Sequence, residues 1–262
     1  MTASALAAAD AADGTTDGVI DLGNVNEQTG SYQFNGTEVM DQAGTRVTSA
    51  GDVDGDGKDD VFISSIFADD GGSSSGEAYL LTAAAMASAD AADGTTDGII
   101  DLDNVNEQTN SYQFVGTQAD DLAGIDISAA GDVDGDGKND FLIGARAADG
   151  GGAGSGEAYL LTAAALASAD AADGTTDGII DLDNVNEQTN SYQFVGTEVG
   201  DDAGISVSFV GDVDNDGKDD LLIGARNADG GGSNSGEAYL MSIASLATAD
   251  AADGTIDGVI DL

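Results

Sequence analysis

The chain has 262 residues, with 50 acidic residues against 6 basic ones and a formal net charge of −44. Nucleic acids and anionic membranes are excluded as favourable partners, because both would repel such a protein. The sequence contains neither cysteine nor histidine, which excludes disulfides, thiolate metal sites and Ser-His-Asp or Cys-His catalysis. No run approaches the ~18 apolar residues of a membrane span, so we expect no membrane insertion.

The acidic residues are mostly aspartates and are clustered with glycine. Low hydrophobicity with high charge is typical of disorder, but 41% of these residues are hydrophobic and they stand in short runs. Clustered Asp and Gly favour oxygen ligands for a hard cation. A salt-adapted acidic surface remains the alternative for the acids outside the clusters.

Three phrases recur every 80 residues. AADGTTDG starts at residues 11, 91 and 171, with AADGTIDG at 251; SYQF starts at 31, 111 and 191; GEAYL starts at 76, 156 and 236. This period predicts one region over 1–262, with repeat units of about 31–110, 111–190 and 191–262. Because the first residues match internal copies of the repeat, we expect the chain to be part of something larger.

Each unit predicts four short strands, and the third copy shows them best. ISVSF (205–209) alternates apolar and small polar residues, LLIGA (221–225) is a continuous apolar run, and EAYLM (237–241) follows a Gly-rich loop. SYQF is the fourth strand. The insertion between the third and fourth strands contains an Ala-rich stretch over 162–169 that favours a helix capped by Thr162.

Repeated units of four antiparallel strands indicate an all-β fold, a β-propeller of three four-stranded blades with short helix-loop insertions. The fourth strand of the last blade is then supplied by about 31–34, which closes the ring. Three blades are fewer than the ~4–8 usual for propellers. A small ring, a homodimer in which three blades pair into six, and part of a larger propeller all stay open.

The loop between the first two strands reads D-x-D-x-D-G-x-D-D, as in GDVDGDGKDD from Gly51, with Asn139 in place of one aspartate in the second unit. Positions 1, 3, 5 and 9 offer carboxylates, position 6 is a glycine suited to a sharp turn, and position 7 offers a main-chain carbonyl. Calcium takes about 6–8 such oxygens. The predicted ligands are Asp52, Asp54, Asp56, Lys58 and Asp60; Asp132, Asp134, Asp136, Lys138 and Asp140; and Asp212, Asp214, Asp216, Lys218 and Asp220.

An EF-hand would need an acid at position 12, where this loop has Ile63, so the motif is a calcium loop between strands. The alternative is an acidic turn without metal. That alternative must explain several carboxylates held close together without a counter-charge.

The order of a strand, DxDxDGxxD, LLIGA and ADxGGxxxGxAYL resembles the FG-GAP repeat of integrin α-subunit propellers and of bacterial extracellular proteins. The resemblance covers all three units and implies a calcium-binding propeller involved in cell adhesion. The Phe-Gly of the family stands here as Ala43-Gly44, Ala123-Gly124 and Ala203-Gly204. These departures concern partner binding and leave the calcium ligands unchanged.

A weaker metal candidate is the D-G-T-T-D-G-I-I-D phrase of the insertion, which resembles half an EF-hand. Its position 12 is neutral, for instance Asn104, and an Asp-Gly turn that ends a helix is an equal alternative. The residues concerned are Asp13, Thr15, Asp17, Val19 and Asp21; Asp93, Thr95, Asp97, Ile99 and Asp101; Asp173, Thr175, Asp177, Ile179 and Asp181; and Asp253, Thr255, Asp257, Val259 and Asp261.

These features predict a calcium-stabilised extracellular module of a bacterial surface or secreted protein, serving adhesion or binding of a protein or glycan ligand. Extracellular calcium suits weak loops of this kind. The alternatives are a purely structural repeat spacer and, from another class, a secreted hydrolase or its accessory domain. We expect no enzyme, because the carboxylates recur in every unit whereas an active site usually occurs once. Arg146 and Arg226 are expected to pair with local aspartates.

Overall fold

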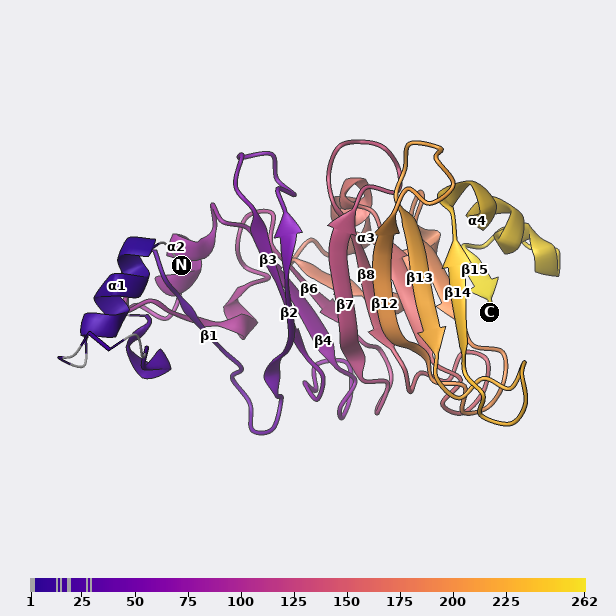
Figure 1. Ribbon diagram of the computed structural model, residues 1–262, viewed down its shortest axis with the longest axis horizontal. Coiled ribbons are helices and arrows are strands. Elements are labelled where there is room, and N and C mark those ends of the chain that lie inside the picture. The colour runs from indigo at the N-terminus through magenta and orange to yellow at the C-terminus, as the bar shows by residue number, and fades with distance from the viewer. Residues whose placement is uncertain (1–2, 13, 15, 18–19, 27, 29) are drawn as a thin grey trace.

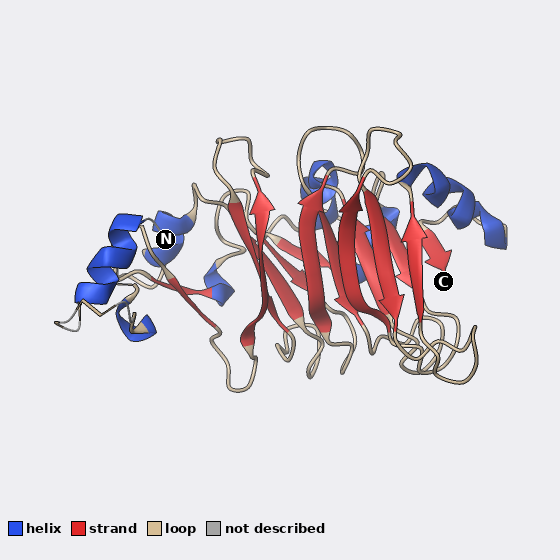
Figure 2. Cartoon of the chain, viewed as in Figure 1, coloured by secondary structure: helices blue, strands red, loops and turns tan. Residues whose placement is uncertain are grey.

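The computed structural model describes residues 3–262 except 13, 15, 18–19, 27 and 29, and its strands form a row of similar sheets (Figures 1 and 2). We call each of the three larger sheets a blade. The strands of the first blade, in spatial order, are β2 (Ala43–Gly51), β3 (Asp60–Ser65), β4 (Glu77–Leu81), β6 (Tyr112–Val115) and β10 (Ile179–Asp181). Those of the second are β7 (Ala123–Gly131), β8 (Asp140–Ala145), β9 (Glu157–Leu161), β11 (Tyr192–Val195) and β15 (Val259–Asp261).

The third blade has three strands: β12 (Ala203–Gly211), β13 (Asp220–Ala225) and β14 (Glu237–Met241). A separate pair at the N-terminal end consists of β1 (Gln33–Asn35) and β5 (Ile99–Asp101). The insertions carry helices α1 (Ala3–Ala11), α2 (Met86–Asp90), α3 (Leu166–Asp170) and α4 (Ile243–Asp250). They also carry the 3₁₀ turns η1 (Leu22–Asn24), η2 (Leu102–Asn104), η3 (Ala163–Ala165), η4 (Leu182–Glu187) and η5 (Ala251–Asp253).

The expectation of a mostly β chain with three similar sheets is confirmed. In the first two blades the four predicted strands pair antiparallel in the expected order, and SYQF of one unit joins the blade of the unit before it. The predicted helix over 162–169 is divided into η3 and α3, and Thr162 makes no side-chain cap bond. A fifth strand was not predicted: the GIID segment, GVID in the last copy, adds parallel to the SYQF strand.

Residues 31–34 do not supply the fourth strand of the last blade in this structure. β1 instead pairs parallel with β5, with Gln33 opposite Ile99, and lies at the end of the molecule away from β14 (Figure 1). The same contact joins β6 to β10 and β11 to β15, so each SYQF strand pairs with the GIID strand that follows it. Among the described strands, β14 bonds to β13 alone, and ring closure is not shown.

The core lies between successive blades, because each blade presents apolar side chains to the next. Between the first two blades, Phe62, Phe114 and Phe141 are fully buried. The ring of Phe62 meets that of Phe114 at 5.7 Å and that of Phe141 at 5.4 Å, both edge to face, a favourable aromatic geometry. Leu142, Leu160 and Leu221 lie in the corresponding cluster between the second and third blades. Stacking therefore buries faces that a single blade would expose.

In the described part of the chain, no helix combines the length and the apolar composition that crossing a membrane requires.

Candidate metal centres

The aspartate loops follow β2, β7 and β12 and leave the same edge of the blades (Figure 1). Each turns sharply at residues in the left-handed region, where glycine is favoured. Gly55 and Gly57 of the first loop have φ of 84° and 86°, and Asn215 takes the place of the earlier glycine in the third loop with φ of 64°. These turns bring three of the four predicted carboxylates of each loop close together.

The carboxylate of the first aspartate in each loop accepts hydrogen bonds from main-chain N–H groups of the same turn. In the first loop, the Gly55 N–H donates to Asp52 Oδ1 at 2.8 Å, and the Gly57 N–H donates to Asp52 Oδ2 at 2.9 Å. Asp132 receives the same two bonds from Gly135 and Gly137. These bonds fix the carboxylate at the start of the loop before any ligand is considered.

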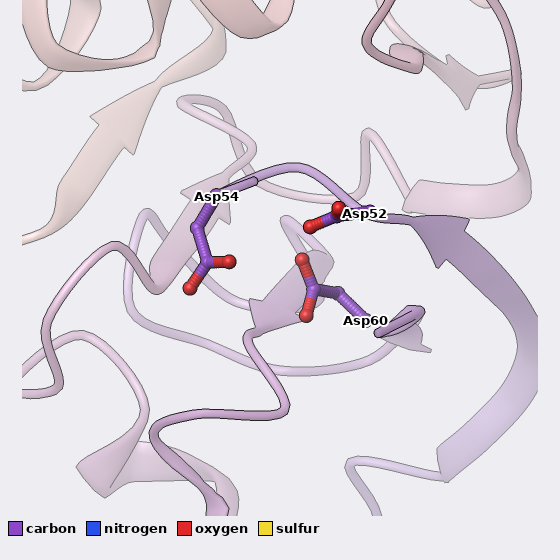
Figure 3. A group of neighbouring side chains, drawn as sticks. All are labelled: Asp52, Asp54 and Asp60. Atoms are coloured by element: carbon purple, nitrogen blue, oxygen red, sulfur yellow. The ribbon is translucent and has the colours of Figure 1, made fainter. Parts of the chain in front are cut away.

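Three carboxylates gather in each loop. Asp52, Asp54 and Asp60 each place one oxygen within 4.8 Å of the others, and their side chains point toward one another (Figure 3). The corresponding groups are Asp132, Asp134 and Asp136 in the second loop and Asp212, Asp214 and Asp220 in the third. Two charges at such a separation repel by about 1 to 4 kcal/mol, depending on the local dielectric. A divalent cation would remove that repulsion.

The remaining predicted carboxylate lies outside the group in each loop: Asp56, Asp140 and Asp216. Asp56 is held by the Lys58 ammonium at 2.9 Å, and this hydrogen bond lowers the pKa of Asp56. The ammonium of Lys58 thus neutralises an acid beside the group. The main-chain carbonyls predicted as ligands at Lys58, Lys138 and Lys218 stay a prediction.

The last aspartate of each loop is buried at the start of the second strand. Asp60 accepts the Val53 N–H at 2.9 Å and the Ala83 N–H at 2.7 Å, and Asp140 accepts the equivalent bonds from Val133 and Ala163. Burial raises the pKa of Asp140 to about 7, with Asp134 and Asp132 adding repulsion. Burial also raises the pKa of Asp60. Without a cation, ionisation is therefore costly at these positions.

The second and third aspartate loops are joined to one another by hydrogen bonds. The Asp132 N–H donates to Asp219 Oδ2 at 3.0 Å, and the Asp219 N–H donates to the Asp132 carbonyl at 3.2 Å. Asp132 is also the first carboxylate of the second group. Order in one loop is thereby linked to the packing of two blades.

The weaker candidates form turns that lead into the fifth strand of a blade. Asp93 Oδ1 accepts the Thr95 N–H and hydroxyl, Asp97 Oδ1 accepts the Ile99 N–H, and buried Asp90 accepts the Gly98 N–H. Among the described residues, no group of three close carboxylates occurs in these phrases. Their metal binding stays a prediction, and Asp13, Thr15 and Val19 lie outside the described residues.

Arg146 and Arg226 both pair with an aspartate, as expected, and they share the same one. Arg226 bonds to Asp202, and the Arg146 guanidinium lies 3.8 Å from the other oxygen of that carboxylate. They join the second and third blades.

A buried carboxylate network that the sequence reading missed lies in GEAYL. Glu77 accepts the Asp70 N–H, the Tyr79 hydroxyl and the Gln113 amide, the last at 2.9 Å. Glu157 holds Tyr159 and Gln193 in the same way. Burial raises the pKa of Glu77 to about 7. The sequence did contain a signal for this network: in every unit a glutamate stands in the otherwise apolar GEAYL strand, and a glutamine stands in SYQF.

Residues 43–81, 123–161 and 203–241 each match the FG-GAP repeat, so the chain contains three FG-GAP repeats. Each match runs from the first strand of a blade through the aspartate loop to the third strand. A comparison with curated proteins finds no match.

The buried carboxyls predict that the calcium-free protein loses stability as the pH rises. Burial raises the pKa of Glu77 and Asp121 to about 7 in the folded state, whereas unfolded carboxyls titrate near ~4. Between about pH 4 and 7 the folded state therefore binds more protons than the unfolded state does. The stability that these groups contribute is fully present below about pH 4 and is lost as the pH rises to about 7. For Glu77 this pKa shift corresponds to about 3 kcal/mol at most.

The check is the melting temperature in excess EDTA at pH 5 and pH 8. We expect a lower value at pH 8, and a smaller difference for Glu77→Gln. The exposed Glu38→Gln is the matched control, since it removes the same charge from the surface. Equal pH dependence in the two variants would contradict the assignment to Glu77.

Proposed function

We propose that this chain, with its three FG-GAP repeats, is a calcium-stabilised extracellular module serving adhesion or ligand binding in a bacterial surface or secreted protein. The observation that carries the proposal is the recurrence of three close carboxylates in the same loop of every blade. Oxygen ligands in a flexible arrangement suit calcium better than magnesium, which requires near-octahedral geometry.

The net negative charge of the chain also supports calcium binding. Three divalent ions would offset six of the 44 net negative charges, all within the groups of close carboxylates. Loops of moderate affinity fill where calcium reaches ~10⁻⁴–10⁻³ M, as it does outside cells. We propose an extracellular or cell-surface location on this ground.

No catalytic role is proposed. The loop aspartates recur at the same positions in all three blades, whereas an active site is ordinarily unique to one place in a chain. A structural spacer is the second candidate, because the segment from Asp90 to Thr117 recurs unchanged at Asp170 to Thr197. A recognition surface normally needs one blade that differs from the others.

Calcium is expected to stabilise the fold through the three loops. In thermal unfolding, the melting temperature should rise from EDTA through a calcium titration and respond far less to magnesium. A site held at ~100 times its dissociation constant adds about 2.7 kcal/mol when only the folded state binds. The Asp134→Asn variant should lose about one third of the stabilisation by calcium, the contribution of one site.

Asp120→Asn is the matched control for Asp134→Asn. Asp120 is exposed, outside the carboxylate groups, and at φ of 69°, a conformation that asparagine tolerates. An unchanged melting temperature with calcium, or equal losses in the two variants, would remove the physical basis of the proposal.

Adhesion predicts calcium-dependent binding of the chain to cells, matrix proteins or arrayed glycans. The triple variant Asp54→Asn, Asp134→Asn, Asp214→Asn should bind as weakly as the wild type in EDTA. Binding that is absent under every calcium condition would support the spacer instead.

A further inference from the structure

The two ends of the molecule hold complementary parts of one blade. The third blade consists of the inner strands β12, β13 and β14, and the N-terminal pair β1 and β5 corresponds to the two outer strands. In the first two blades, the strand equivalent to β1 pairs antiparallel with the strand equivalent to β14. The same register would set Gln33 opposite Tyr239 and Phe34 opposite Ala238.

The polar partners that complete a blade are present but separated. In the complete blades, the amides of Gln113 and Gln193 donate to Glu77 and Glu157, each at 2.9 Å. The equivalent Glu237 accepts the Tyr239 hydroxyl and, in the described part of the chain, no glutamine amide. Gln33 is exposed and donates to Asn35 instead.

The serine that begins the SYQF phrase is the second sign of a missing partner. Ser111 Oγ accepts the Thr82 N–H at 3.2 Å, and Ser191 Oγ accepts the Thr162 N–H at 3.3 Å. Ser31 Oγ is buried and has no hydrogen-bond partner. By the repeat spacing, its donor is the N–H of Ser242.

The chain that follows β14 lacks a bond that the complete blades have. Asp60 and Asp140 accept the N–H of Ala83 and Ala163, the residues next to the serine-bound N–H groups. In the third blade the corresponding oxygen, Asp220 Oδ1, is buried without a partner. The bond is thus absent in the one blade that lacks its SYQF strand.

Some apolar side chains at the two ends of the molecule are exposed, although their equivalents in the other repeats are buried between blades. Ile127 faces the preceding blade and is 7% exposed, whereas its equivalent Val47 on the first blade is 68% exposed. Leu80 and Leu160 are fully buried, whereas their equivalent Leu240 on β14 is 54% exposed. The two uncovered faces are therefore the two halves of the blade-to-blade contact already made twice within the chain.

We propose that a second copy of this chain docks head to tail, adding its β1 to the open edge of β14 and its first blade to the face of the third. The Gln33 amide then reaches Glu237, Ser31 Oγ accepts the Ser242 N–H, and Leu240 becomes buried. The contact joins different surfaces of the two copies, so repetition gives either a closed ring or an open chain. It does not depend on whether the aspartate loops hold calcium.

Sedimentation velocity over a range of protein concentrations tests the proposal, with and without calcium. High ionic strength is required, because the acidic copies repel and the screening length falls to about 3 Å near 1 M salt. We expect mass-action association of the wild type. Two substitutions should each weaken the association at least about tenfold. Leu240→Lys would bury an unpaired charge, and Gln33→Glu would lose the charge-assisted hydrogen bond to Glu237.

Both substitutions are at exposed positions, so the isolated chain should keep its fold. Ile256→Lys and Gln118→Glu are the matched controls, since both side chains are exposed and lie outside the proposed contact. Leu240→Lys retains an intact β1 and Gln33→Glu an intact β14. At a concentration where each variant alone is monomeric, an equimolar mixture of the two should therefore form a one-to-one complex.

A wild type that is monomeric at every concentration would overturn the proposal, and would be the result if residues 31–34 closed a ring within one chain. Association of Leu240→Lys equal to that of its control would overturn it as well. Loss of calcium binding with association retained would contradict the proposed function alone.

Discussion

Repulsion among the aspartates of each loop is the constraint on which the other features depend. The loop joins the first two strands of a blade, and its last aspartate begins the second strand and receives two main-chain N–H bonds in the complete blades. The second and third loops are bonded directly through Asp132 and Asp219. A cation that relieves the crowding would therefore stabilise the hairpin, the blade and the contact between blades together.

Hydrophobic burial in this chain comes from contact between blades. Phe62, Phe114 and Phe141 form one core across two blades, and Arg146 and Arg226 join two blades through Asp202. In such repeats, stability is approximately a sum of unit and nearest-neighbour contributions. The units at the two ends therefore each have an uncovered face, as the exposed side chains of Val47 and Leu240 show. The open edge of β14 is a separate feature, and such edges readily pair with another strand.

Much of the blade was predictable from the sequence because period and alternation report directly on strands. EAYLM was placed at the observed bounds of β14, and the aspartate spacing identified the loops whose carboxylates gather. The GIID strand was missed because three residues in an Asp-Gly context read as a turn. In this structure residues 31–34 pair with β5 and not with β14, which the repeat alone could not foresee, since it shows that a SYQF strand fits an EAYL edge but not which copy supplies it. Which carboxylate stays outside each group depends on side-chain contacts such as Lys58 with Asp56, which spacing does not encode.

The number of calcium ions bound per chain tests the central claim most directly, by isothermal titration calorimetry of the metal-free protein. The account predicts three sites, one for each group of close carboxylates, falling to two when Asp134 is replaced by asparagine. A titration without calcium binding at millimolar concentration would contradict it, and the loops would then be acidic turns whose repulsion the fold tolerates without a metal.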